Sequence, residues 1–261
     1  MIDFSSHLIR FCSFVDEFCS KNPEDQENID LKKNHSLRVY QEAKHLTACL
    51  DAPERYIQLS RLTALYHDIG RFPQYFQYGS FNDKITVNHG LMGYKTLKNN
   101  SFLSGISAKE RKTVLFGVLN HNRAKIPKAL PESNLFVLEV VRDSDKLDIM
   151  NVLLAYFEDE ANSNSVVTLG LDSHPDKYSQ KVVDSLLSGK LVDYQDLVWI
   201  NDFKLMLLSW VHDFNFSHTQ SQVINRGYME RVLSLLPGTA DIRDVKDRIY
   251  SCMYINQSPT A

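Results

Sequence analysis

The residues best suited to chemistry in this chain are a histidine and an aspartate that follow each other after an apolar segment. His67 and Asp68 lie in LTALYHDIGRF, with His35 upstream and Asp145 downstream. Imidazole nitrogens and carboxylate oxygens together favour borderline divalent ions such as those of zinc, iron, manganese or cobalt, whereas magnesium and calcium sites are built mostly from oxygen. These residue types therefore predict a site for a divalent transition metal.

Helices must position these residues, because apolar side chains recur at helical spacing over most of the chain. Leu62, Leu65, Tyr66 and Ile69 are one example, and no run of strict alternation rivals this pattern. The pattern predicts an all-α fold, a multi-helix bundle with the metal site in its core. We expect helices at about residues 3–20, 30–50, 53–69, 88–99, 107–121, 132–158, 175–188, 193–214, 218–236 and 241–256.

On these helices the candidate ligands are far apart in sequence, so only a bundle core can bring them together. His67 and Asp68 close the third helix, and Gly70 lets the chain turn away beyond them. A buried aspartate is costly unless it is paired or bound to metal, and the apolar neighbours of Asp68 favour burial. The segment from Gly70 to Val87 lacks clean periodicity and is rich in aromatic residues. We expect it to be an ordered loop that roofs a pocket.

Length and charge limit the classes of protein that remain. At 261 residues, with no Gly/Ser-rich or Pro-rich linker, residues 1–261 are expected to form a single domain. A net charge of -3 argues against extended nucleic-acid binding but is compatible with a small anionic substrate. No apolar run reaches the roughly 18 to 20 residues that span a bilayer. We therefore expect a cytoplasmic protein without a membrane partner and with four free cysteines; the sequence makes no prediction of oligomeric state.

The local sequence around these four residues resembles the HD-domain superfamily of metal-dependent phosphohydrolases. His35 lies in NHSLRVY, His67 and Asp68 in LYHDIGRF, and Asp145 in RDSDKLDI. The resemblance covers an HD-like core at about residues 30–155 and leaves a C-terminal helical extension at about 175–257 outside it. It implies that these four residues hold one metal ion.

Two further histidines lie between the pair and the final aspartate, His89 in VNHGLMGY and His121 in VLNHNRAK. Similar six-ligand members of the superfamily use two such histidines for a second metal, with the aspartate of the His-Asp pair bridging both ions. The resemblance thus implies one or two divalent ions of iron, manganese, zinc, cobalt or nickel. The alternative is that either histidine only hydrogen-bonds its neighbours.

The implied activity is hydrolysis of a phosphate ester, of a nucleotide or a small phosphorylated metabolite, with a metal-bound hydroxide as nucleophile. Asp68 would be catalytic as the bridging ligand, and Arg71 would stabilise the phosphoryl group unless it serves as an ion pair that pins the following loop. Arg38 and Lys146 are further candidates for substrate binding. Asp148, three residues after Asp145, is expected to orient a ligand histidine or the water, or else to pair with a lysine.

Other activities use the same ligands. Myo-inositol oxygenase resembles the six-ligand pattern but holds a di-iron centre that activates oxygen, and a regulatory module could keep the scaffold without catalysis. No ligand of the expected set is missing, which argues against the regulatory module. The chain lacks the GYP and HHE signatures, which argues against cyclic dinucleotide hydrolysis.

Some residues resemble site residues without the expected context. A second pair, His212 and Asp213, follows the last expected ligand and has no matching aspartate downstream, so we interpret it as a decoy. His218 is expected to be a cap or surface residue. Two larger sets of residues have two interpretations each. The basic residues Arg123, Lys125 and Lys128 could form a rim for an anionic substrate or a solvated face. The aromatic residues Phe72, Tyr75, Phe76, Tyr78 and Phe81 could stack on a base or pack in the core.

Overall fold

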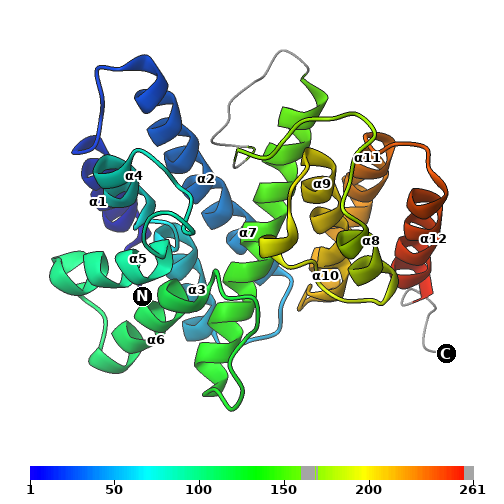
Figure 1. The fold of residues 1–261 in the computed structure, drawn as a ribbon. Coiled ribbons are helices and arrows are strands. Elements are labelled where there is room, and N and C mark those ends of the chain that lie inside the picture. The colour runs from blue at the N-terminus through cyan, green and yellow to red at the C-terminus, as the bar shows by residue number, and fades with distance from the viewer. Residues whose placement is uncertain (160–167, 169, 256–261) are drawn as a thin grey trace. The chain divides into compact units, whose positions relative to one another are not determined.

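The computed structural model describes residues 1–159, 168 and 170–255. Within this part of the chain the fold is all-α, which confirms the predicted fold class, and two residues, Asp172 and Trp199, form an isolated β-bridge. The α-helices (Figure 1) are α1 Phe4–Asp16, α2 Pro23–Ala48, α3 Glu54–Tyr66, α4 Arg71–Tyr78, α5 His89–Asn99, α6 Ala108–Asn120, α7 Glu132–Glu158, α8 Gln180–Leu187, α9 Ile200–Ser209, α10 Ser217–Asn225, α11 Tyr228–Ser234 and α12 Ala240–Ile255.

The chain divides into two compact units, Met1–Asp148 and Ile149–Ala261, and the long helix α7 runs through the boundary. All the predicted metal ligands lie in the first unit. That residues 1–261 form a single domain stays a prediction, which the number of unfolding transitions would test. Of the predicted C-terminal extension, residues 256 and 257 lie outside the described residues.

In the first unit, α3 packs against α2 and α6, and α6 also packs against α5. Val39, Leu62, Leu65 and Val118 are fully buried between these helices. A close approach brings the turn after α3 onto α5: a Cβ atom at Gly70 would lie 2.3 Å from the carbonyl oxygen of His89. Only a residue without a side chain fits there, so Gly70 lets the His67-Asp68 turn pack against the start of α5.

The predicted loop over residues 70–87 is wrong in its first half, because residues 71–78 form α4. Pro73 falls in the first turn of this helix, where a missing N–H costs no hydrogen bond. Phe72 and Tyr75, three residues apart, are buried on one face, and Gly79 ends the helix with a φ of 62°. Eight residues were too few for the pattern to emerge from the sequence.

Two helices predicted in the second unit are shorter or divided. The range 218–236 contains α10 and α11, separated at Gly227, whose φ of 63° interrupts a right-handed helix. The range 193–214 contains only α9 as α-helix, flanked by the single-turn 3-10 helices Tyr194–Asp196 and Trp210–His212. In this unit α8 packs against α9 and α12, and α9 packs against α11.

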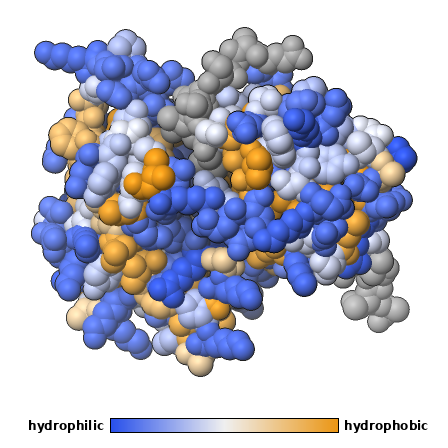
Figure 2. All heavy atoms as spheres, in the orientation of Figure 1, coloured by the Kyte–Doolittle hydropathy of each residue, from blue (hydrophilic) through white to orange (hydrophobic). Residues whose placement is uncertain are grey.

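The surface drawn in Figure 2 is mostly hydrophilic, with hydrophobic residues in small separate groups. Among the described residues, no helix combines the length and the apolar character that crossing a membrane requires.

Candidate metal centre

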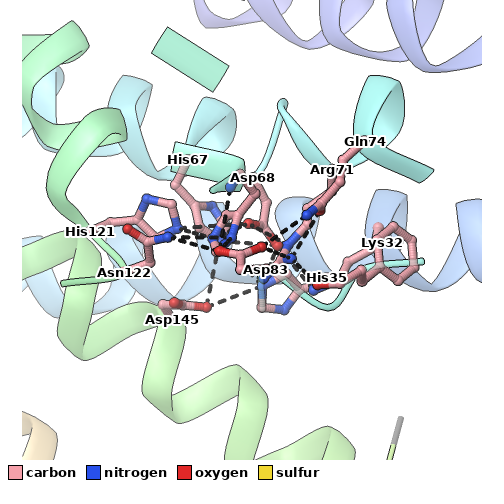
Figure 3. Close-up of polar contacts among 12 residues, drawn as sticks. Lys32, His35, His67, Asp68, Arg71, Gln74, Asp83, His121, Asn122 and Asp145 are labelled. Atoms are coloured by element: carbon pink, nitrogen blue, oxygen red, sulfur yellow. Dashed lines mark hydrogen bonds and ion pairs between the residues drawn. The ribbon is translucent and has the colours of Figure 1, made fainter. Parts of the chain in front are cut away.

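Five segments bring the predicted ligands together (Figure 3). His35 comes from the middle of α2, His67 is the C-cap residue directly after α3, and Asp68 follows it. The remaining ligands lie at the first residue of α5, at the end of α6 and within α7: His89, His121 and Asp145. Helix ends allow a side chain to face a neighbouring helix, which is why four of the six ligands lie at or next to one.

The first group of ligands surrounds one oxygen of Asp68. The Nε2 atoms of His35 and His67 lie 3.2 Å apart, and the Nε2 of His35 is 3.1 Å from Oδ1 of Asp145. Oδ2 of Asp68 lies 3.6 Å from His35 Nε2 and 3.9 Å from His67 Nε2. These atoms could all reach one cation.

The second group surrounds the other oxygen of the same carboxylate. The Nε2 atoms of His89 and His121 lie 3.0 Å apart, and they are 3.4 and 3.7 Å from Oδ1 of Asp68. Asp68 therefore stands between two pairs of imidazoles and presents one oxygen to each.

Every one of the four imidazoles is oriented through its other nitrogen. The Nδ1 atoms of His67 and His121 donate to the carbonyl oxygens of the residues three positions earlier, Ala64 and Val118, at 2.8 Å. The Nδ1 atoms of His35 and His89 donate to carboxylates, Asp148 at 2.7 Å and Asp83 at 2.6 Å. Since Nδ1 is used as a donor, Nε2 is left to bind a cation, an arrangement typical of metal-ligating histidines.

The donor set fits a metal better than it fits a self-sufficient hydrogen-bond network. Asp68 is 2% exposed, and His35, His67, His89 and His121 are also buried. Among the described residues, none donates a hydrogen bond to the buried Oδ1 atoms of Asp68 and Asp145. Buried carboxylate oxygens without donors are costly, and a cation held between them and the imidazole nitrogens removes that cost. Within the described part of the chain, two overlapping sets of three side chains have ligand atoms close enough together to hold a metal ion: His35 with His67 and Asp145, and His67 with Asp68 and His121.

The two pairs of imidazoles around Asp68, His35 with His67 and His89 with His121, differ in the pKa of one member. Burial opposes the charged form of His35, but the carboxylates of Asp145 and Asp148 outweigh it and raise its pKa to about 9. Burial, followed by the nearby charge of Arg71, lowers the pKa of His89 to about 3. At neutral pH the imidazole of His89 is thus neutral, while that of His35 is protonated and would have to lose a proton to bind a cation. The pKa of Asp68 lies well below its usual value because Lys32, Arg71 and His67 together outweigh its burial.

The predicted substrate-binding cations are mostly engaged by carboxylates. Arg38 pairs with Asp148 through Nε at 2.6 Å and Nη2 at 3.1 Å. Arg71 donates from Nη1 to Asp83 Oδ1 at 3.0 Å, and its Nε lies 3.4 Å from Oδ1 of Asp68. Lys146 is buried, and its substrate role stays a prediction.

The other candidates for substrate binding differ in their exposure to solvent. The basic residues Arg123, Lys125 and Lys128 are exposed, and their role as a rim for an anionic substrate stays a prediction. Of the five aromatic residues considered for stacking, Phe72, Tyr75 and Phe81 are buried, while Phe76 and Tyr78 are exposed.

Sequence reasoning missed Asp83 and Lys32, both of which contact the centre. Asp83 holds His89, accepts from Arg71 and also accepts from the side-chain amide of Gln74 at 2.9 Å. Lys32 pairs with Oδ2 of Asp68 at 3.1 Å. Asp83 lies in the segment without periodicity, so nothing signalled its position, whereas Lys32 lies three residues before His35 and shares its helix face.

The second His-Asp pair, His212 and Asp213, belongs to neither group of potential metal ligands found in the described part of the chain. That this second pair is a decoy stays a prediction. His218, expected as a cap or surface residue, is half-buried near the start of α10.

Comparison with known families agrees with this geometry. The model of the family described as "HD domain" matches residues 33–150, a range that includes all six candidate ligands. Residues 33–150 are therefore an HD domain, and the resemblance to the superfamily of metal-dependent phosphohydrolases is confirmed. Searches of curated proteins and of solved structures gave no match for this chain.

Proposed function

We propose that this protein is a binuclear metal-dependent phosphohydrolase that acts on a phosphate ester of a nucleotide or a small phosphorylated metabolite. The observation that carries the proposal is the carboxylate of Asp68, whose two oxygens each face a separate pair of imidazole Nε2 atoms. The HD domain in residues 33–150 supports the same class of reaction.

His35, His67, Asp145 and Oδ2 of Asp68 would hold one ion, and His89, His121 and Oδ1 of Asp68 would hold the other. Bound there, divalent ions would supply an acidified water as nucleophile and positive charge to stabilise the transferred phosphoryl group. Mixed nitrogen and oxygen ligands favour iron, manganese, zinc, cobalt or nickel.

The chain's own residues would fix the geometry of this reaction. Asp148 and Asp83 hold His35 and His89 in place by hydrogen bonds of 2.7 and 2.6 Å, so the ligands need not reorganise when a cation enters. Arg71, whose Nε faces Oδ1 of Asp68, would contact a nonbridging oxygen of the phosphoryl group through its unused N–H. Arg38, which pairs with Asp148 through Nε and Nη2, would act by orienting that carboxylate.

A metal count combined with an activity panel tests the proposal. The protein is purified without added metal, reconstituted with each candidate ion, and assayed on phosphomonoesters, phosphodiesters and nucleotides with and without oxygen. We expect two ions per chain and oxygen-independent turnover of at least one ester. Turnover that requires oxygen and spares all esters would identify a di-iron oxygenase instead, and a loaded protein inactive in every assay would favour a regulatory module.

A further inference from the structure

Lys32 is a cation at the centre whose ion-pair partner is also the bridging ligand. Its Nζ lies 3.1 Å from Oδ2 of Asp68, and its side chain is 19% exposed. The same ammonium lies 5.5 Å from the centroid of the Phe81 ring, which is buried. Lys32 therefore reaches from the edge of the site to the carboxylate that both groups of imidazoles share (Figure 3).

Two other cations near the centre, Arg38 and Arg71, already make several hydrogen bonds. Arg38 makes a two-point contact with Asp148, and Arg71 donates to Asp83, Gln74 and the carbonyl oxygen of Phe81. Asp148 and Asp83 are the carboxylates that orient His35 and His89. The two arginines thus hold the carboxylates that orient His35 and His89, and Arg71 would in addition offer its Nε–H to the phosphoryl group.

Lys32 differs because cation binding removes its partner. Once both oxygens of Asp68 are ligands, their charge is shared with divalent ions, and the ammonium of Lys32 is left beside them without a counter-ion. An anion that binds between the ammonium of Lys32 and the metal site would neutralise that positive charge. A lysine suits this task because it offers three donors on a flexible stem and binds phosphate as a point charge.

We infer that Lys32 binds the phosphoryl group of the substrate in the metal-loaded protein and is the principal cation that recognises it. This inference rests on the proposed function and extends it to a residue outside the matched HD-domain range. It favours substrates with a terminal phosphate, which offers more free oxygens and charge than a diester.

The test compares K32M with K33M in the metal-loaded protein. Lys33 is the neighbouring residue on the same helix, and it pairs with the exposed Asp16 at 2.9 Å, away from the ligands. Binding of inorganic phosphate is measured by isothermal titration calorimetry, metal content by elemental analysis, and KM and kcat on the best ester of the panel. For K32M we expect unchanged or higher metal content and phosphate binding weaker by about ten- to a hundredfold, as for loss of a charged hydrogen bond. KM should rise by a similar factor, K32R should recover part of the loss, and K33M should match the wild type.

A purely structural role for Lys32 predicts a different result. In that case K32M would lower the melting temperature of the metal-free protein but leave phosphate affinity in the loaded protein unchanged, and the inference would be overturned. If K32M does not fold, acetylation of the wild-type loaded protein decides: phosphate should slow modification of Lys32 relative to Lys33, and equal rates would overturn the inference.

The two proposals can fail separately. Ester hydrolysis by the wild type with unimpaired phosphate binding by K32M rejects the role of Lys32 alone. Lys32-dependent phosphate binding by a protein that hydrolyses no ester rejects the proposed hydrolysis and keeps the anion site.

Discussion

The same dipeptide occurs in both compact units, but among the described residues only the first copy belongs to a group of side chains that could hold a metal ion. In the first unit, His67 and Asp68 are buried among three further histidines and Asp145. In the second unit, His212 is half-buried, and its Nε2 has no hydrogen-bond partner among the described residues. Burial and the nearby charge of Arg248 lower its pKa.

The difference between the two copies lies in what other segments contribute. The first copy ends a helix that packs against α2 and α6, which carry His35 and His121. Gly70 then brings the start of α5 and His89 within reach. A His-Asp pair thus becomes a metal site only when the fold supplies partners for it.

The largest expected effect comes from replacing Asp68, and the same replacement at Asp213, in the second pair, is the control. D68A removes a ligand from both groups, so we expect it to lose both ions and at least about a thousandfold in activity, or ~4 kcal/mol of transition-state stabilisation. D213A should keep two ions and wild-type activity. Elemental analysis and kcat/KM on the same preparations check both, and a D68A protein with full metal content would remove the bridging role of Asp68.

A smaller effect is expected at Asp83, which orients His89. D83N removes the negative charge of Asp83 and weakens the hydrogen bond that holds the imidazole of His89. Affinity for the second ion should therefore fall by about ten- to a hundredfold, while the first ion is retained. Competition with a metal indicator dye measures this. D16N, at an exposed carboxylate paired with Lys33, is the matched control and should bind both ions as the wild type does.

Proton competition should distinguish the two groups of ligands. The raised pKa of His35, about 9, means that its imidazole is protonated at pH 7 and must lose a proton to bind metal. Affinity for the first ion should therefore rise by about tenfold per pH unit between pH 7 and 9 and then level off. His89, with a pKa of about 3, contributes no such slope to the second ion. Metal titrations in buffers from pH 6.5 to 9.5 test this, and equal slopes for the two ions would contradict it.

The smallest expected effect concerns stability. G70A places a methyl group 2.3 Å from a carbonyl oxygen of α5, so the turn and the helix must separate, which should cost about 1–3 kcal/mol. G238A in the second unit adds a methyl group in open space and should change stability little. Thermal unfolding with and without metal checks this, and a G70A protein as stable as G238A would show that the close approach is relaxed at no cost.

Much of this architecture, but not all of it, could be predicted from the sequence. The helical class and the convergence of His35, His67 and Asp145 could be predicted because residue type and spacing recur over long helices. Asp148 contacts His35, and its role in orienting a ligand histidine stays a prediction. Asp83 could not be foreseen, because its position depends on the short helix α4 and the turn after it.

Lys32 was missed for a different reason. Its spacing from His35 was visible, but its pairing with Asp68 depends on how α2 packs against the turn after α3. The predicted role of Arg71 in substrate binding and the exact number of ions stay predictions, because they depend on groups that only the loaded protein contains.

The central claim, that Asp68 bridges two ions, is tested most directly by anomalous X-ray diffraction from crystals of the manganese-loaded protein. The account predicts two manganese peaks per chain, one next to each oxygen of Asp68, and none at His212. A single peak, or two peaks without contact to Asp68, would contradict it.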